Sequence, residues 1–349
     1  MIHLAFEASL LAGKKTGIGQ YAYYLLLELK KCEDLQITLL HSSKKWCGPD
    51  LGLPTQSYYF VKESLGIYFR LNSMLNKIGA DIFHAPGNTG LPSKVSIPSV
   101  VTIHDLFALL HTEKVGWKYR FSFRLLSRWV VNGASHIFCN SQQTFDEMDS
   151  YFAFPKEKMT VTHLGPCKQT EWQGGGDYFL CVGALEERKG QAFLTDAYLA
   201  ALQEKRHLPK LVFVGPDRGD GEKVNEAVER SKGQIVWRDY VDDLELEKLY
   251  RNTRALLIPS QYEGFGLPLL EGLLSGVPVV CSDIPIFHEV GQSYVDYCTY
   301  GNLEEWKRVL SRTQVYQKRE LSDEYRQEFS WHNCAKKTIE IYKKVLSVK

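Results

Sequence analysis

The stretch Leu256–Glu271, with the sequence LLIPSQYEGFGLPLLE, is where the fold of this chain can first be inferred. An apolar run ends at Pro259, a loop with two glycines follows, and Pro268 then suits the first turn of a helix. Gly264 and Gly266 allow the backbone to approach a ligand closely. The stretch therefore predicts a buried strand, a ligand-facing turn and a helix in succession, which is the repeating unit of a parallel sheet.

Similar units occur along the whole chain. In the second half, apolar runs predict strands at Tyr178–Val182, Leu211–Val214, Ile235–Trp237, Leu256–Pro259 and Val277–Ser282. In the first half they predict strands at Ile2–Phe6, Ile37–Leu40, Ile82–His84, Val100–His104, Ile137–Asn140 and Val161–Leu164. Segments with helical periodicity, such as Gln191–Leu202 and Glu245–Asn252, separate them. We therefore predict an α/β protein of two doubly wound, Rossmann-like parallel-sheet domains that face a central cleft.

The break between the two series lies at Cys167–Asp177 (CKQTEWQGGGD), which loses periodicity and contains three consecutive glycines. We place an N-terminal domain at residues 1–168, a linker at 169–177 and a C-terminal domain at 178–328. The segment Trp331–Leu346 carries one apolar stripe. Residues 329–349 are therefore expected to form a C-terminal helix that packs back towards the N-terminal domain.

The composition excludes several classes of protein. The length of 349 residues exceeds the size of one hydrophobic core, and 44% apolar with 24% charged residues is typical of globular proteins. A net charge of +1 supplies no field for holding a polyanion, so no nucleic-acid partner is expected. The eight cysteines form no CxxC pair, which favours reduced thiols. Glu7 interrupts the first apolar stretch too early for a signal peptide, so a cytoplasmic protein is predicted.

Two carboxylates flank the glycine turn after Pro259. Parallel sheets bind ligands beyond the carboxyl ends of their strands, where Glu263 and Glu271 are expected to lie. A carboxylate accepts hydrogen bonds from vicinal hydroxyls, so both side chains suit a ribose or a hexose. The alternative is that Glu263 is an acid at a helix start and Glu271 a solvated helix residue.

Other chemistry-bearing residues also follow predicted strands. Cys181–Gly190 (CVGALEERKG) places Arg188 and Lys189 at the start of a helix, where two cations can neutralise a pyrophosphate leaving group. The alternative is a solvated charge pair. Gly215, Tyr240 and Val241 stand at two further strand ends and are expected to flank a nucleotide.

In the first half, Thr16-Gly17-Ile18-Gly19 forms a glycine turn before the predicted helix Gln20–Leu29. His104 and Asp105 end an apolar strand at the edge facing the cleft, with Asp105 expected to orient the imidazole. A lone His or a lone glycine turn is more often structural.

Taken together, these motifs resemble the retaining GT-B glycosyltransferases of family four, in the bacterial mannosyltransferase-like group. The run Glu263-Gly-Phe-Gly-Leu-Pro-Leu-Leu-Glu271 looks like that family's E-x7-E motif. The remaining matches fall in the family's order: Thr16–Gly19, His104-Asp105, Asn140-Ser141, Glu187–Gly190 and Phe329–Trp331. One departure is Ala184, where some relatives have an Arg, so one phosphate contact is expected to be missing.

The resemblance implies roles for the residues. Glu263 would contact the donor sugar, Glu271 the ribose, and Arg188 with Lys189 the donor phosphates. The expected catalytic residues are His104, Glu263, Arg188 and Lys189. The expected donor-binding residues are Gly17, Gly19, Arg188, Lys189, Gly215, Tyr240, Val241, Gly264, Phe265, Gly266, Leu267 and Glu271. No metal ligands and no cofactor are expected, because the nucleotide-diphosphate sugar is a substrate and the two cations can act in place of a metal.

The acceptor is expected to be a saccharide or a lipid-linked molecule. Lys114–Arg128 mixes basic and aromatic residues and contains no acid, which fits peripheral contact with the inner face of an anionic membrane. A surface helix with snorkelling arginines explains the pattern equally well. Mannose from GDP-mannose is the leading donor hypothesis. The alternatives for the whole chain are a nucleotide-sugar epimerase and a non-catalytic scaffold that keeps the fold.

Overall fold

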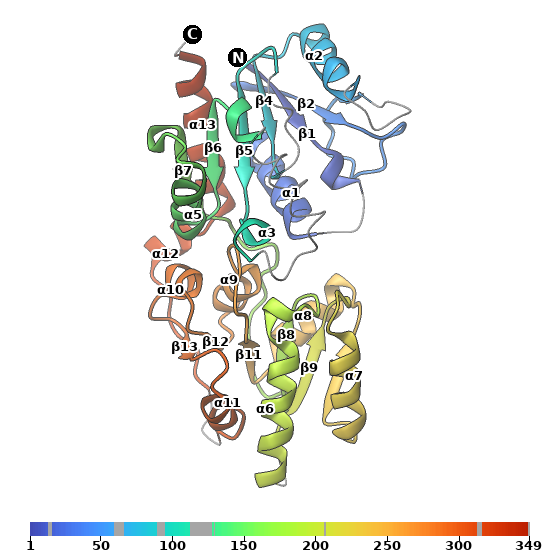
Figure 1. Ribbon diagram of the computed structural model, residues 1–349, viewed down its shortest axis with the longest axis vertical. Coiled ribbons are helices and arrows are strands. Elements are labelled where there is room, and N and C mark those ends of the chain that lie inside the picture. Colours follow the sequence, from blue (N-terminus) through green and yellow to red (C-terminus); the bar gives the residue numbers. More distant parts are fainter. Residues whose placement is uncertain are drawn as a thin grey trace. The chain divides into compact units, whose positions relative to one another are not determined.

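The computed structural model describes residues 1–12, 16–58, 66–88, 95–111, 128, 130–205, 207–312 and 316–347 (Figure 1). The chain forms two compact units. Unit 1 contains Met1–Cys167 together with Gln327–Lys349, and unit 2 contains Lys168–Arg326. The chain therefore leaves unit 1, builds unit 2 and returns to unit 1 for its last helix.

Unit 1 is built around a seven-stranded sheet in which all neighbouring strands are parallel and the order is β3-β2-β1-β4-β5-β6-β7. Its strands are β1 (Ile2–Glu7), β2 (Leu35–His41), β3 (Thr55–Ser57), β4 (Ile82–Ala85), β5 (Ser99–Ile103), β6 (His136–Cys139) and β7 (Met159–Val161). Its α-helices are α1 (Gly17–Leu29), α2 (Gly66–Ile78), α3 (Phe107–Leu110), α5 (Gln142–Phe152) and α13 (Trp331–Ser347). Two short 3-10 turns, η1 (Ser9–Leu11) and η3 (Lys156–Lys158), complete the described elements.

Unit 2 repeats this plan with six parallel strands in the order β10-β9-β8-β11-β12-β13. Its strands are β8 (Tyr178–Val182), β9 (Lys210–Val214), β10 (Ile235–Arg238), β11 (Ala255–Ile258), β12 (Val279–Ser282) and β13 (Asp296–Cys298). Its helices are η4 (Glu187–Lys189), α6 (Gln191–Glu204), α7 (Gly221–Arg230), α8 (Asp243–Asn252), α9 (Leu267–Leu274), α10 (Pro285–Gly291) and α11 (Leu303–Leu310). Helix α12 (Asp323–Glu328) spans the point at which the chain returns to unit 1.

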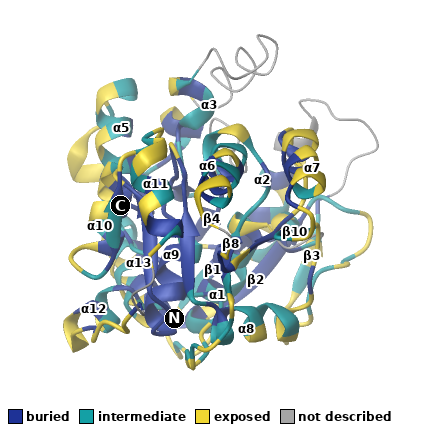
Figure 2. Ribbon diagram, turned by 90° about the horizontal axis from the view of Figure 1, so that it is seen from below, coloured by how far each residue is buried: buried dark blue, intermediate teal, exposed yellow. Residues whose placement is uncertain are grey.

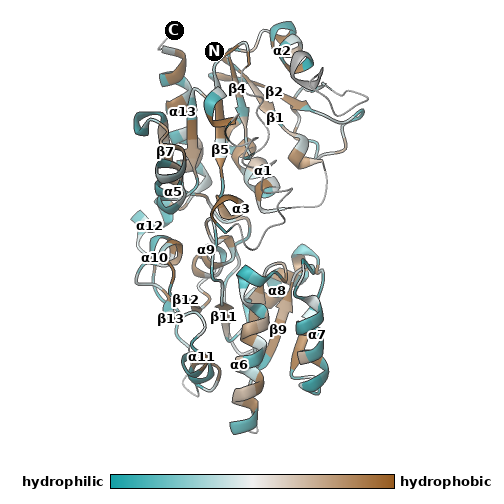
Figure 3. Ribbon diagram, in the orientation of Figure 1, coloured by the Kyte–Doolittle hydropathy of each residue, from teal (hydrophilic) through white to brown (hydrophobic). Residues whose placement is uncertain are grey.

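The predicted α/β class with two parallel sheets is confirmed. The strands are apolar because helices cover both faces of a doubly wound sheet, which leaves little strand surface in contact with water. Figure 2 shows the strands mainly as buried, and Figure 3 shows hydrophobic residues concentrated on strands while α7 and α11 carry hydrophilic outer faces. Each unit thus has a core of its own, with Phe83 and Val101 in the core of unit 1 and Phe213 and Leu257 in that of unit 2.

The structure corrects several element boundaries. The strand predicted at Val161–Leu164 lies earlier, at Met159–Val161, and the strand that was expected to include His104 ends at Ile103. The strands β3 and β13 were not predicted, because each has only three residues and neither contains a run of branched apolar side chains. Short edge strands of this kind depend on pairing with a neighbour more than on their own composition.

Residues 169–177, expected to link the domains, contain no helix or strand and are hydrogen-bonded to unit 2. The Trp172 indole donates to the Thr253 carbonyl at 2.7 Å, and the Gly176 amide donates to the Asn252 carbonyl at 2.8 Å. At the other end of the chain, helix α13 lies beside α1 in unit 1, where Trp331 stacks on Tyr24 with ring centroids 5.5 Å apart.

Candidate functional site

The strand order of each unit identifies the place where a ligand can bind. In unit 2 the chain runs from β8 to β9 and β10 on one side, and β11 then starts on the other side of β8. In unit 1 the same reversal occurs between β1 and β4. At such a switch point the two loops leave the sheet in opposite directions and open a crevice beyond the carboxyl ends of the strands. Unit 2 therefore offers a candidate site at the loops after β8 and β11, and unit 1 separately offers one at the loops after β1 and β4.

The loop after β8 is shaped by glycine at two positions. Gly183 has φ +145° and Gly190 has φ +69°, conformations that side chains with a Cβ rarely adopt. A Cβ on Gly190 would lie 2.1 Å from the Pro259 carbonyl oxygen. The start of α6 can therefore approach the end of β11 only because residue 190 is glycine, and this approach brings Arg188 and Lys189 to the second loop.

The two loops are joined by hydrogen bonds from both the main chain and the side chain of Arg188. The Gln261 amide donates to the Arg188 carbonyl at 2.7 Å, and the Arg188 guanidinium donates to the Tyr262 carbonyl at 3.4 Å. Arg188 Nε also donates to Glu186 at 2.9 Å. These bonds hold the loop after β11 against the loop after β8 independently of any ligand.

Glu263 is the centre of this arrangement. Lys189 Nζ donates to Glu263 Oε1 at 2.9 Å, and Ser260 Oγ donates to the same oxygen at 3.0 Å. Arg188 Nη1 lies 3.7 Å from the other oxygen, Oε2. All three charged side chains are largely buried, with 11% of the Glu263 side chain exposed. The structure thus brings Glu263 together with Arg188 and Lys189, which lie 75 and 74 positions before it in the sequence.

The electrostatics of this cluster keep Glu263 ionised. Burial alone would raise the pKa of Glu263, but the charges of Lys189 and Arg188, with the hydrogen bonds from Lys189 and Ser260, outweigh burial and lower the pKa. The interpretation of Glu263 as an acid that only marks a helix start does not fit, because its partners are cations of another loop. A buried carboxylate beside two cations can accept a hydroxyl hydrogen bond while the cations face an anion.

Glu271 lies on α9 and is also buried. Only 6% of the residue is exposed, and Tyr250 of α8 donates its hydroxyl to Glu271 Oε2 at 3.2 Å. The interpretation as a solvated helix residue is therefore wrong. The helix starts after Gly266, which has a φ of +93°. A Cβ added at this residue would lie 2.9 Å from the Phe287 ring. Both observations require glycine at this position.

The other residues of unit 2 that were expected to bind the donor also follow the carboxyl ends of strands. A Cβ on Gly215, after β9, would lie 2.1 Å from the Gly183 carbonyl oxygen, so the loops after β8 and β9 touch. Tyr240, after β10, is 82% exposed, whereas Val241 is buried. In the loop before α9, Gly264 and Phe265 are buried and Leu267 is half-buried. The Tyr240 ring is thus presented to solvent rather than packed in the core.

In unit 1, His104 directly follows β5. Its Nε2 lies 2.8 Å from the Pro86 carbonyl, which can only accept, so Nε2 carries the proton and Nδ1 presents a lone pair. The ring packs edge-on against Tyr21 of α1 at 4.8 Å between centroids. Burial lowers the pKa of His104, although the Pro86 hydrogen bond and the Asp105 charge act in the opposite direction.

The backbone of His104 is fixed from both sides. Its amide donates to Asn88 Oδ1 at 3.0 Å, and its carbonyl accepts from Asn140 Nδ2 at 2.9 Å. The expected orienting role of Asp105 is corrected, because that carboxylate accepts the Phe107 amide at 3.2 Å and the imidazole is bonded to Pro86. A backbone carbonyl leaves no mark in the sequence, so sequence reasoning could not find Pro86.

The glycine turn of unit 1 is the first turn of α1 and not a loop before it. Thr16 caps the helix, with its side-chain oxygen accepting the Gly19 amide at 3.1 Å. A Cβ on Gly19 would lie 2.9 Å from the Leu10 carbonyl oxygen, whereas nothing lies within 4 Å of a Cβ on Gly17. Gly19 is therefore required by packing. Gly17 has no such reason in the described structure.

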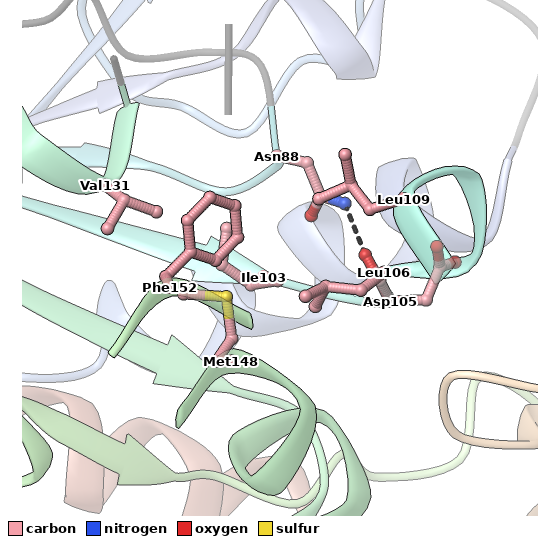
Figure 4. A pocket seen from close by; sticks show the side chains of 8 residues that line it. All are labelled: Asn88, Ile103, Asp105, Leu106, Leu109, Val131, Met148 and Phe152. Carbon is pink, nitrogen blue, oxygen red and sulfur yellow. Dashed lines mark hydrogen bonds between the residues drawn. The ribbon is translucent and has the colours of Figure 1, made fainter. Parts of the chain in front are cut away.

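A small apolar pocket lies beside His104 in unit 1 (Figure 4). Ile103, Met148 and Phe152 contribute to its apolar wall, while Asn88 donates to the Asp105 carbonyl at 2.9 Å. The pocket thus adjoins the strand end that carries His104.

The region expected to contact a membrane, Lys114–Arg128, lies outside the described residues except for Arg128. None of the described helices combines the length and the apolarity needed to cross a membrane. Among the described residues, no three His, Cys, Asp or Glu side chains gather as metal ligands would.

Comparisons with known proteins agree with this geometry. Residues 15–165 match the family model Glycosyltransferase Family 4, and residues 176–312 match the model Glycosyl transferases group 1. O-antigen chain mannosyltransferase B of Escherichia coli is 28% identical over 297 residues, which cover 75% of this chain and 74% of that protein. O-antigen chain mannosyltransferase RfbU of Salmonella typhimurium is 26% identical over 221 residues, covering 60% of this chain and 59% of the relative.

Another relative, the serotype-specific mannosyltransferase WbdA of Escherichia coli, is 34% identical over 224 residues, which cover 56% of this chain. The aligned part is 27% of WbdA, so that protein is several times longer than the shared region.

Solved structures support the fold. Sucrose-phosphate synthase from Thermosynechococcus elongatus superposes with a TM-score of 0.76 at 14% identity over the full length of both chains. Anabaena HepE, in complex with UDP and glucose, superposes with a TM-score of 0.73 at 16% identity, covering 99% of this chain and 100% of HepE.

Two doubly wound parallel-sheet units that superpose on these structures define the GT-B fold, and the two family matches show a glycosyltransferase. The chain belongs to glycosyltransferase family 4, whose members transfer sugars with retention of anomeric configuration.

Proposed function

We propose that this enzyme transfers a hexose from a nucleotide-diphosphate sugar to a saccharide or lipid-linked acceptor in surface-glycan biosynthesis, with GDP-mannose as the leading donor. The mannosyltransferase names of its relatives support the sugar, and the complex of HepE with UDP supports a nucleoside diphosphate as the ligand class. Unit 2 is proposed to bind the donor and unit 1 the acceptor.

The observation that carries this proposal is the cluster of Arg188, Lys189 and Glu263 at the switch point of unit 2. Departure of a nucleoside diphosphate builds negative charge, and two preplaced cations stabilise that charge without reorganisation. Glu263 accepts hydrogen bonds from the donor sugar and Glu271 from the ribose. Gly215, Tyr240 and Val241, with the loop Gly264–Leu267, complete the proposed donor site on unit 2, and the resemblance to family four adds Gly17 and Gly19 of unit 1 as proposed contacts of the donor phosphates.

The proposed reaction proceeds on one face of the sugar. The bond between the anomeric carbon and the diphosphate oxygen breaks, the acceptor oxygen bonds to that carbon on the same face, and the acceptor proton passes to the departing phosphate. His104 supports this step as a neutral ring whose Nδ1 accepts a hydrogen bond from a sugar hydroxyl. The residues of this chain hold the reactants in place and stabilise charge, which is where most of the rate enhancement originates.

A thermal-shift panel of GDP-, UDP- and dTDP-sugars without added metal tests the proposal, followed by hydrolysis of the stabilising donor. The shift should disappear in Lys189→Ala and Glu271→Ala. It should persist in Lys223→Ala, a matched control whose partner is Asp220 on the same unit. Stabilisation by no nucleotide sugar would favour the non-catalytic scaffold, and conversion of the donor without transfer would favour the epimerase.

A further inference from the structure

The proposed function creates a conflict at Glu263 that the structure helps to resolve. Lys189 now donates to Glu263 Oε1 at 2.9 Å, yet the same ammonium is needed for the donor diphosphate. Lys189 has a long flexible side chain, and a diphosphate carries more charge than one carboxylate. When the donor binds, Glu263 must therefore lose part of the interaction that orients it, at the stage when its orientation matters for transfer.

Ser260 provides a second hydrogen bond to the same carboxylate. Its hydroxyl donates to Glu263 Oε1 at 3.0 Å, and only 2% of the residue is exposed. The backbone on both sides is fixed, because the Pro259 carbonyl abuts Gly190 and the Gln261 amide donates to the Arg188 carbonyl. Unlike Lys189, Ser260 has a short side chain that cannot follow a ligand.

We propose that Ser260 is a positioning residue, which holds Glu263 Oε1 when Lys189 turns to the diphosphate and so keeps Oε2 available to a hydroxyl of the donor sugar. This inference rests on the proposed function of the site. Ser260 anchors Oε1 to the protein, and Oε2 lies 3.7 Å from Arg188 Nη1.

The inference predicts that removing the Ser260 hydroxyl affects transfer more than binding. In Ser260→Ala, Arg188 and Lys189 remain, so the dissociation constant for the nucleoside diphosphate should change by less than about twofold. The rate constant kcat should fall about tenfold, the effect of losing one hydrogen bond to a charged group. Ser260→Thr keeps the hydroxyl and should restore most of kcat.

A pH profile separates positioning from general loss of structure. The Ser260 hydrogen bond lowers the pKa of Glu263, so its removal should move the acid limb of kcat to higher pH. Among the described residues, Lys189, Arg188 and the Cys181 thiol also lie near Glu263, and burial raises the pKa of that thiol to about 12.

The experiment measures nucleoside-diphosphate affinity, kcat, KM and the pH profile of the full chain for wild type, Ser260→Ala, Ser260→Thr and Ser231→Ala. Ser231 is a matched control, because it is equally buried and its hydroxyl donates to the Val228 carbonyl at the far end of α7. Its replacement should lower thermal stability without moving the acid limb.

Unchanged kcat in Ser260→Ala, or an affinity that falls in proportion to kcat, would overturn the inference. A Ser260→Thr variant that is folded and as slow as Ser260→Ala would do the same. If wild type itself binds no nucleoside diphosphate, the proposed function fails, and the inference fails with it. That result is distinguishable because it appears before any substitution is made.

Discussion

At the scale of single residues, Glu263 is the side chain whose environment says most about the site. Its carboxylate is buried between Lys189 and Arg188 and keeps its charge because these cations outweigh the effect of burial on its pKa. Glu263 therefore pairs with the same cations that we propose for the diphosphate. We therefore expect the diphosphate to replace Glu263 as the partner of Lys189 when the donor binds. We call this replacement the exchange.

This exchange predicts that Glu263→Gln binds a nucleoside diphosphate more tightly than wild type while losing transfer. The neutral amide no longer competes for Lys189 and Arg188, so affinity should rise about fivefold, or about 1 kcal/mol. Isothermal titration with GDP and UDP measures this change. Glu328→Gln is the matched control, because Glu328 also accepts from a lysine, Lys337, but lies in unit 1. Weaker binding by Glu263→Gln would contradict the exchange.

At the scale of elements, the first turn of α1 contains two glycines that look alike in the sequence but differ in their surroundings. Thr16 caps this helix, Gly19 lies against the Leu10 carbonyl, and Gly17 has open space where a side chain would be. A helix tolerates alanine better than glycine by about 1 kcal/mol. Nothing in the described fold requires glycine at residue 17, which is consistent with the proposed approach of a ligand.

We expect Gly17→Ala to leave the protein as stable as wild type or more so, and to weaken donor binding about tenfold, the effect of about 1.4 kcal/mol. Gly19→Ala should destabilise unit 1 because its Cβ would lie 2.9 Å from a carbonyl oxygen. Thermal unfolding and nucleotide-sugar titration of the two variants, measured together, distinguish packing from ligand contact. Normal donor binding by Gly17→Ala would remove Gly17 from the proposed site.

At the scale of the whole molecule, the chain closes unit 1 with its last helix. Trp331, Cys334 and Tyr342 of α13 are buried, and the Trp331 indole donates to the Pro166 carbonyl at 2.8 Å. The Tyr342 hydroxyl lies 2.5 Å from His84 Nδ1. The core of unit 1 therefore depends on residues that follow unit 2 in the sequence.

Removing residues 331–349 should unfold unit 1 and leave unit 2 folded. Each large buried side chain contributes roughly 1.5–3 kcal/mol, so the loss of several is comparable to the whole stability of an ordinary domain. Limited proteolysis should yield a resistant fragment that starts near Lys168. Lys336→Ala, on the exposed face of the same helix, is the control and should leave the digestion pattern unchanged. Resistance of both units after the truncation would contradict this prediction.

Buried histidines make unit 1 sensitive to acid. Burial lowers the pKa of His84 to about 3, that of His136 to about 4, and that of His104 below its ordinary value. Below about pH 6.5 these histidines become protonated in the unfolded chain but stay neutral in the folded unit. The free energy of unfolding therefore falls as pH decreases. Each such group contributes up to about 1.4 kcal/mol per pH unit until its folded pKa is reached.

Denaturant unfolding of unit 1 should therefore give a lower free energy of unfolding at pH 5 than at pH 7. In His136→Gln, the slope of this free energy against pH should be smaller. His332→Gln is the control, because this ring is exposed on α13. A slope that does not change in His136→Gln would show that other groups govern the acid sensitivity.

The alternation of strands and helices, the two parallel sheets and the membership of glycosyltransferase family 4 could all be inferred from sequence patterns. These features depend on local patterns that recur along the chain. An apolar run, a glycine turn or a proline indicates the burial and backbone conformation of the residues next to it. The same kind of pattern singled out Glu263, Arg188, Lys189 and His104. It did not reveal the short strands β3 and β13, whose pairing with a neighbour matters more than their composition.

Only the tertiary structure decided which of these residues meet. Lys189 and Glu263 touch because β8 and β11 are neighbours in the sheet, although they are far apart in the sequence. Ser260 and the Pro86 carbonyl act on Glu263 and His104 through geometry that carries no pattern in the sequence. The physical reason is that sequence patterns record burial and backbone conformation along the chain, whereas contacts between loops depend on strand order and on close packing.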